Sequence, residues 1–413
     1  MSLLIGQTRS KLDGVIRTID DLRSLDYPFP DPVAVLNLIR EAFAKIRADF
    51  GDGVEKVDET TIKNLCKRAQ EEIQNYLPIL GFIERSSDLE APVEMHGPVA
   101  RLTRKAIQTD ANLVIFPEWD YSPFTFLFPE LTKRGVVVVG MPRSESHNAL
   151  LAPLSGHELG HNVWQRERLT EKFSSKAQEL IVDQITKDWS KWKDDLGLSA
   201  PEQLSDLVGY RYIEAPHLWS IRQAEETFCD FIGLLIFRDS YLHSFRYLLT
   251  PGESVRLTFN YPTLKTRARF HAGAAKTLGI PVPSGYEGSF DESVDDADGL
   301  RKQYGELADL TCQKLVDDLL ASAQQVVSVR NLSAFRPEEV ARVRKCLKMG
   351  VPTTGTTGIE NILIGAWQFF LEDNVEFDAN LAAVKAGEGV LVLNELILKT
   401  LEVNEIEERL RAS

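Results

Sequence analysis

The sequence is poor in cysteine and lacks any closely paired cysteines. Its 4 cysteines lie far apart, and no two of them stand in a CxxC spacing. Such a distribution argues against a disulfide-stapled scaffold and is typical of proteins in a reducing compartment. We therefore expect a cytoplasmic protein.

Long apolar runs and an excess of basic residues are also missing. Runs such as Phe231–Phe237 are far shorter than the roughly 20 residues of a membrane span, and the apolar stretch at the N-terminus is too short for a signal-peptide core. With 47 Lys and Arg against 61 Asp and Glu, the net charge is −14. This balance disfavours nucleic acid and anionic membranes as main partners.

Two catalytic signatures are absent as well. The chain has no G-x-S-x-G nucleophile elbow, which argues against a Ser-His-Asp hydrolase. The glycine-rich stretch 350–358 lacks the Gly-Lys-Ser/Thr ending of a phosphate-binding loop. We find no long-period repeat either.

The length and hydrophobic pattern predict a predominantly helical α+β protein. The 413 residues, 43% of them hydrophobic, suffice for two or three structural units. We expect a helical N-terminal region at 1–95, a catalytic domain at 96–285 with an insertion at about 166–218, and a helical C-terminal region at 286–413. Asp31 before Pro32 is typical of a helix N-cap. Strands are predicted at 112–116 and 136–140, and helices outside the central domain at 8–24, 32–49, 59–84, 300–327, 336–348, 358–373 and 391–411.

Residues 157–161, His-Glu-Leu-Gly-His, form the most informative motif. On a helix, His157 and His161 lie one turn apart on one face and can bind one metal ion, with Glu158 beside it. Apolar neighbours such as Leu154 and Val163 predict a buried helix, in which ionisable groups need partners. The alternative is a solvated polar stripe on a helix surface.

A zinc site of this kind needs a third protein ligand. The extended pattern HExxHxxGxxH is absent, because Trp164 and Glu167 occupy its last two positions. A second predicted helix, at 219–238, is apolar except for a few residues that include Glu225, Glu226 and Asp230. The two carboxylates of Glu226 and Asp230, four residues apart, share one face of that helix.

Together, HExxH and the later Glu-xxx-Asp pattern resemble the metal helices of the gluzincins, the thermolysin-like zinc peptidases. The resemblance implies a zincin-like catalytic unit with a small sheet, and one zinc ion per chain. It makes Glu226 the third ligand and Asp230 the group that supports a zinc-bound histidine, with Glu225 as the competing ligand. It covers the two helices and their flanks, with a longer gap between them than in compact members.

A third segment follows at 260–271. Several HExxH peptidase families carry a His-Pro-x-x-x-x-Arg-like element after the glutamate ligand, and here Tyr261-Pro262 and Arg267 take those places. The resemblance implies that Tyr261 or Arg267 donates to the oxyanion of a tetrahedral intermediate. The alternative is a proline at a helix start followed by exposed cations. His217, His243 and His271 are further possible donors, and the alternative for each is an ordinary surface or core histidine.

The function that this resemblance implies is zinc-dependent hydrolysis of a peptide or protein substrate. Zinc lowers the pKa of its bound water towards about 7, and Glu158 then takes the proton as that water attacks a carbonyl. An edge strand of a zincin often pairs with an extended peptide, and Val136–Gly140 is a candidate for that strand. Phe124–Phe128 is another candidate, although phenylalanines on alternate positions favour one apolar face on the core. The alternatives are a small amide or ester substrate, or a scaffold with a structural or inactive metal site.

Overall fold

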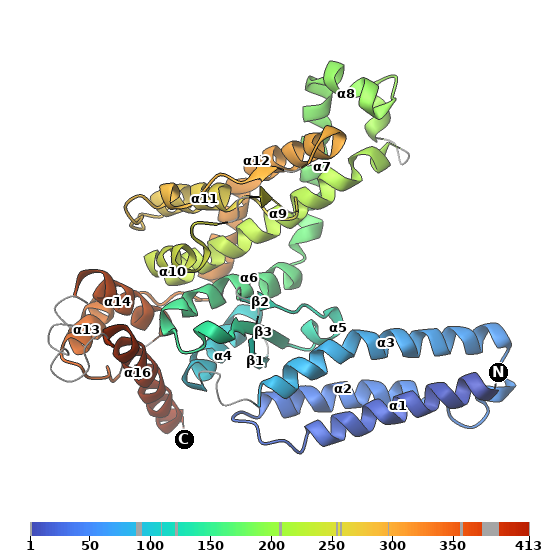
Figure 1. The fold of residues 1–413 in the computed structure, drawn as a ribbon, viewed down its shortest axis with the longest axis horizontal. Coiled ribbons are helices and arrows are strands. Elements are labelled where there is room, and N and C mark those ends of the chain that lie inside the picture. Colours follow the sequence, from blue (N-terminus) through green and yellow to red (C-terminus); the bar gives the residue numbers. More distant parts are fainter. Residues whose placement is uncertain are drawn as a thin grey trace. The chain divides into compact units, whose positions relative to one another are not determined.

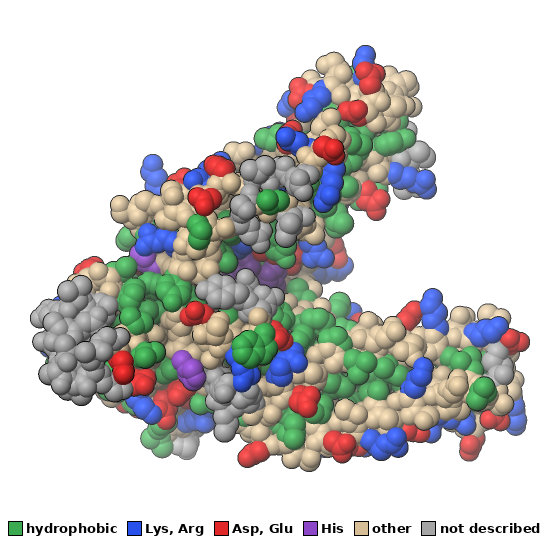
Figure 2. Space-filling view, viewed as in Figure 1, with side chains coloured by type: hydrophobic (Ala, Val, Ile, Leu, Met, Phe, Trp, Pro, Cys, Tyr) green, Lys and Arg blue, Asp and Glu red, His purple; other side chains and the backbone are tan. Residues whose placement is uncertain are grey.

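The computed structural model describes residues 2–87, 93–108, 110–119, 123–205, 209–252, 255–256, 258–295, 297–355, 358–373 and 388–412. It is predominantly helical with one small three-stranded sheet, as the sequence predicts. In the described residues no helix combines the length and the apolar character that crossing a membrane requires. Acidic and basic side chains are interspersed over the face shown in Figure 2.

The chain divides into two compact units. The first comprises residues 1–96 and 110–147, and the second comprises 97–109 and 148–413. These units do not follow the three ranges expected from the sequence, because the strands share a unit and a core with the N-terminal helices, whereas the helix that carries the HExxH motif belongs to the other unit. Residues 88–92, next to the expected first boundary, and 206–208, within the expected insertion, lie outside the described residues.

The first unit contains three long helices and the sheet (Figure 1). The helices are α1 (Ser2–Leu22), α2 (Asp31–Ala48) and α3 (Glu59–Arg85), close to the predicted ranges. Their buried faces form one core with residues of the sheet, including Val114, Phe116 and Val138. The shorter elements are η1 (Val54–Lys56), α5 (Pro129–Thr132) and η2 (Arg143–Glu145), while α4 (Val93–Ile107) crosses the boundary between the units.

The sheet has the order β1-β3-β2. Strand β1 (Asn112–Glu118) runs parallel to β3 (Val136–Pro142), and β2 (Phe124–Thr125) runs antiparallel to β3. The prediction that Val136–Gly140 is an edge strand is therefore wrong, since β3 is the middle strand and has neighbours on both sides. The alternating phenylalanines of 124–128 pack on the core, which agrees with the structural interpretation of that pattern.

Asp31 does not act as the predicted N-cap. Helix α2 begins at Asp31 itself, with Pro30 in the cap position and no side-chain capping bond. The Asp31 carboxylate instead accepts a hydrogen bond from the backbone N–H of Leu113 at 3.0 Å. This bond satisfies a buried backbone donor at the start of β1, so tertiary pairing replaces local capping.

The second unit is built around α9 (Tyr210–Phe237), a 28-residue helix. Helices α6 (Ser155–Arg166), α7 (Leu169–Lys187), α11 (Leu264–Thr277) and α12 (Gly299–Val329) pack against it. The predicted insertion is helical, and α7 buries residues at four-residue spacing from Leu169 to Ile185. The other elements are η3 (Ala149–Leu154), α8 (Trp189–Leu196), η4 (Pro201–Ser205), α10 (Asp239–Leu249), β4 (Val255–Arg256), η5 (Glu287–Ser289), β5 (Val294–Asp295), α13 (Pro337–Lys348), α14 (Ile359–Glu372) and α16 (Gly389–Ala412).

Candidate metal centre

Two glycines bring α6 into close contact with α9. A Cβ atom on Gly160 would lie 2.6 Å from Cα of Cys229, and one on Gly156 would lie 2.9 Å from Cα of Gly233. Non-bonded carbons normally stay about 3.5–4.0 Å apart, so only glycine fits at these positions. The glycines flank His157 and Glu158 in the sequence, and they let the short carboxylate side chains of α9 reach the histidines of α6.

His157, His161 and Glu226 converge at this contact. Their candidate ligand atoms all lie within 4.8 Å of one another. Nε2 of His157 is 3.3 Å from one carboxylate oxygen of Glu226, and Nε2 of His161 is 3.7 Å from the other. The three side chains retain between 11% and 14% of their exposure, so the site is lined by protein yet reachable from outside. Two imidazoles and one carboxylate are a donor set that zinc accepts.

A carboxylate holds the opposite nitrogen of each histidine. Nδ1 of His157 lies 2.9 Å from Asp230, and Nδ1 of His161 lies 3.0 Å from Glu225. Each Nδ1–H can donate to its carboxylate, which leaves each Nε2 free to face Glu226. The geometry therefore separates the two adjacent glutamates. Glu226 faces both Nε2 atoms, whereas Glu225 orients His161 and also pairs with Arg222 at 3.1 Å.

Asp230 is the centre of a buried polar cluster. Arg267 donates to both of its oxygens, at 2.8 and 2.7 Å, and the Tyr241 hydroxyl donates at 2.7 Å. Nε2 of His271 lies 2.9 Å from the same carboxylate. Burial tends to raise the pKa of Asp230, but the charge and hydrogen bonds of Arg267 and the neighbouring histidines outweigh it and hold that pKa well below its usual range.

Arg267 lies beside the site and is bonded to Asp230. Its guanidinium comes within 4.0 Å of Glu226. The bidentate pair with Asp230 fixes the orientation of Arg267, and its donation to an oxyanion through the remaining N–H groups stays a prediction.

Tyr261 lies near Glu226 and remains accessible. It is 48% exposed, and the negative charge of Glu226, together with partial burial, raises the pKa of its phenol. The predicted helix start after Pro262 is confirmed, because α11 begins at Leu264 behind an N-cap at Thr263. The raised pKa keeps the phenol protonated at neutral pH, so it can donate a hydrogen bond.

Four carboxyl groups are buried here beside three groups that can carry positive charge. Glu158, Glu225, Glu226 and Asp230 are all buried, and they face Arg267 and the two histidines. Because unpaired buried charges are strongly unfavourable, the carboxylates need positive charge, which protonated histidines can supply. A divalent cation between the two Nε2 atoms and Glu226 would supply it, so the residues present fit a metal ion.

The neighbouring carboxylates raise the pKa of both histidines. Burial alone would lower the pKa of His157, but the hydrogen bonds and charges of Asp230 and Glu226 raise it to about 10. Burial also opposes protonation of His161, yet Glu225 and Glu226 raise its pKa. For Glu158 burial dominates and raises the pKa of the carboxyl group, which makes its carboxylate a stronger base.

The three further histidines do not contribute to the ligand group. His217 contacts Ser174 and Tyr210, and the ring of His243 stacks on Trp367. His271 supports Asp230, a role that the sequence does not reveal, since the two residues are 41 positions apart. The contact of Glu225 with Nδ1 of His161 has no signal in the sequence, because only the packing of α9 against α6 distinguishes it from the adjacent Glu226.

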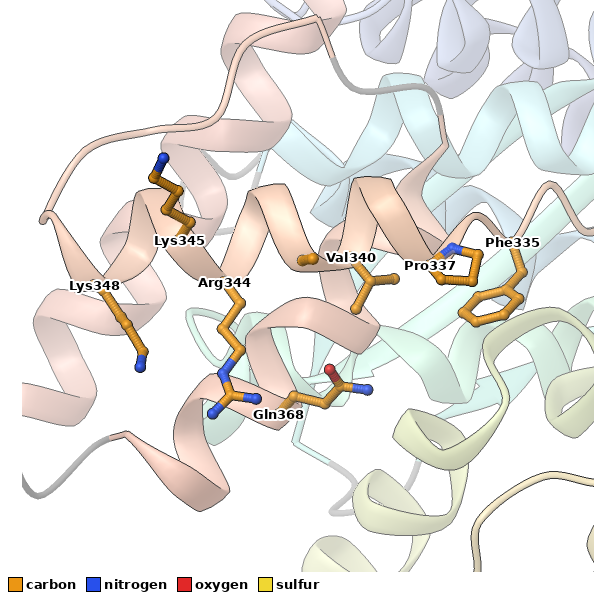
Figure 3. A pocket seen from close by; sticks show the side chains of 8 residues that line it. Phe335, Pro337, Val340, Arg344, Lys345, Lys348 and Gln368 are labelled. Carbon is orange, nitrogen blue, oxygen red and sulfur yellow. The ribbon is translucent and has the colours of Figure 1, made fainter.

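A pocket of about 370 Å³ lies elsewhere, beside α13 and α14 (Figure 3). It contains none of the predicted site residues. Arg344 and Lys348, two of the cations that line it, pair with Glu372 and Asp373, which balance their charge.

Comparison of the chain with protein-family models, with curated proteins and with solved structures gives no match. The functional assignment therefore depends on the residues and their geometry.

Proposed function

We propose that this protein is a zinc-dependent peptidase whose metal helices α6 and α9 form a gluzincin-type, zincin-like unit. The observation that carries the proposal is the convergence of both Nε2 atoms on Glu226, each histidine being oriented from behind by a carboxylate. A solvated polar stripe would need neither the buried carboxylates nor the glycine contact between the helices.

In this proposal His157, His161 and Glu226 hold one zinc ion, and Asp230 and Glu225 hold the two imidazoles in the required tautomer. When bound, zinc supplies Lewis-acid polarisation of the substrate carbonyl and lowers the pKa of water. Glu158, with its raised pKa, takes a proton from the attacking water at its carboxylate and passes it to the leaving amine. The Tyr261 phenol donates to the developing oxyanion.

We further propose a cytoplasmic location and a peptide or protein substrate. The 4 cysteines are free thiols, three of them buried, which suits a reducing compartment. The net charge of −14 favours neither nucleic acid nor an anionic membrane as partner.

The test combines metal analysis with one variant. Purified protein should contain about one zinc per chain by elemental analysis, and it should cleave a set of internally quenched fluorescent peptides. Glu158→Gln should keep the zinc and lose at least about 10²-fold in turnover, because the general base is gone. Protein that refuses added zinc, or normal turnover by the Glu158→Gln variant, would contradict the proposal.

A further inference from the structure

The loop that carries Tyr261 is fastened by the side chain of Arg256. Nε of Arg256 donates to the backbone carbonyl of Thr258 at 3.2 Å, and one terminal nitrogen donates to the carbonyl of Tyr261 at 2.7 Å. Only 6% of the Arg256 side chain is exposed. One guanidinium therefore spans the loop from its start to Tyr261.

Asp309 of helix α12 also holds Arg256 in place. Asp309 accepts two hydrogen bonds from the guanidinium, at 2.7 and 2.8 Å. The guanidinium also lies over the ring of Phe259, 4.6 Å from its centroid. A bidentate and stacked guanidinium has little rotational freedom, so it holds the loop in one position.

Gln223 ties the same loop to the helix that bears the metal ligand. This fully buried residue precedes Glu226 by one turn of α9. Its amide donates to the carbonyl of Phe259 at 2.9 Å and to Asp309 at 2.7 Å. The backbone carbonyls of residues 258, 259 and 261 are thus all bonded to side chains, which is an unusual density of anchors for a surface loop.

We propose that Arg256 and Gln223 are positioning residues that hold the Tyr261 phenol in register with Glu226. Their side chains bond the loop backbone and leave the phenol itself exposed for substrate. The inference rests on the proposed function, since Tyr261 acts on substrate only in that reaction. A donor placed by a rigid backbone needs no reorganisation when charge develops, and a misplacement of about 1 Å is enough to cost about 10²-fold in rate.

The first experiment needs no catalysis. Tyr261 is replaced by 3-fluorotyrosine and its ¹⁹F resonance is recorded in metal-free protein and after addition of zinc. We expect one narrow signal that shifts on zinc addition. We expect Arg256→Lys to broaden it and abolish the shift, because the three donors of an ammonium group cannot replace the four hydrogen bonds of the guanidinium to Asp309 and the two carbonyls. Arg301→Lys is the matched control, since Arg301 also lies over the Phe259 ring, at 5.9 Å. An unchanged signal in the Arg256→Lys variant would overturn the inference.

The second experiment is a double-mutant cycle on peptide hydrolysis. Tyr261→Phe should lower kcat by about 100-fold, Arg256→Lys by about tenfold or more, and the double variant should be no worse than Tyr261→Phe alone. Fully additive losses would mean that Arg256 acts independently of Tyr261 and would contradict the inference. If the wild type shows the zinc-dependent ¹⁹F shift but no hydrolysis, the proposed function fails while the positioning of Tyr261 by Arg256 stands.

Discussion

Replacing Gly160 by alanine tests the contact that assembles the metal centre. The added methyl group would lie 2.6 Å from Cα of Cys229 and 2.9 Å from its Cβ. Carbon atoms not bonded to each other need about 3.5–4.0 Å, so α6 and α9 must separate by about 1 Å at this point. The clash involves the backbone of α9, and no side-chain rotation relieves it.

The expected loss of stability follows from two opposing effects. Overpacking of this kind costs up to about 3 kcal/mol, whereas alanine in place of glycine within a helix contributes about 1 kcal/mol. The net loss is therefore about 2 kcal/mol of unfolding free energy. The same separation moves Glu226 away from both histidines, and we expect zinc affinity to fall by at least about tenfold, because sites tolerate only about 0.5 Å of error.

Gly273 supplies the matched control. It is an exposed glycine in α11, and a Cβ there would meet nothing within 4 Å. Gly273→Ala should therefore stabilise the protein by about 0.5–1 kcal/mol and leave zinc binding unchanged. Both variants are compared by chemical denaturation without metal and by competition with a chelator of known zinc affinity. If Gly160→Ala behaves like Gly273→Ala in both assays, α6 and α9 are not in backbone contact.

Other perturbations test the ligands and their protons. Glu225→Ala should weaken zinc binding by about 10–100-fold, the usual effect of removing a carboxylate that orients a ligand. Glu226→Ala should weaken zinc binding more. The reverse order in chelator competition would make Glu225 the zinc ligand and Glu226 the orienting group. Zinc must displace a proton from His157, whose pKa is raised to about 10. The apparent zinc affinity should therefore keep rising from about pH 6.5 to 10. An affinity that reaches a plateau near neutral pH would contradict the raised pKa. In metal-free protein the same shift contributes stability that is complete below about pH 6.5 and disappears as the pH rises through 10. The depressed pKa of Asp230 acts in the opposite direction. Its contribution to stability is complete above about pH 4 and is lost at lower pH. Asp230→Asn should therefore weaken the fall of unfolding free energy at acid pH, and an unchanged pH dependence would contradict the role of Asp230 in the network.

Local sequence patterns predict most of the secondary structure and the helix that carries the HExxH motif. Helical periodicity places α1, α2, α3, α12, α13, α14 and α16 within a few residues, except at the N-terminal end of α1, and apolar β-branched runs place β1 and β3. The HExxH spacing puts two imidazoles on one helical turn, because 3.6 residues per turn is a property of the backbone alone. These features depend on neighbouring residues, which the sequence displays directly.

Long-range packing decides which face of each helix or strand contacts which neighbouring element. Glu225 and Glu226 are adjacent and chemically alike, and only the orientation of α9 against α6 makes one face both Nε2 atoms and the other bond Nδ1 of His161. The bonds of Arg267 to Asp230 and the middle position of β3 depend on packing in the same way. The sequence alone thus determined the candidate donors and their helices, whereas the tertiary structure decided which atoms they face, because such contacts join side chains that are remote along the chain.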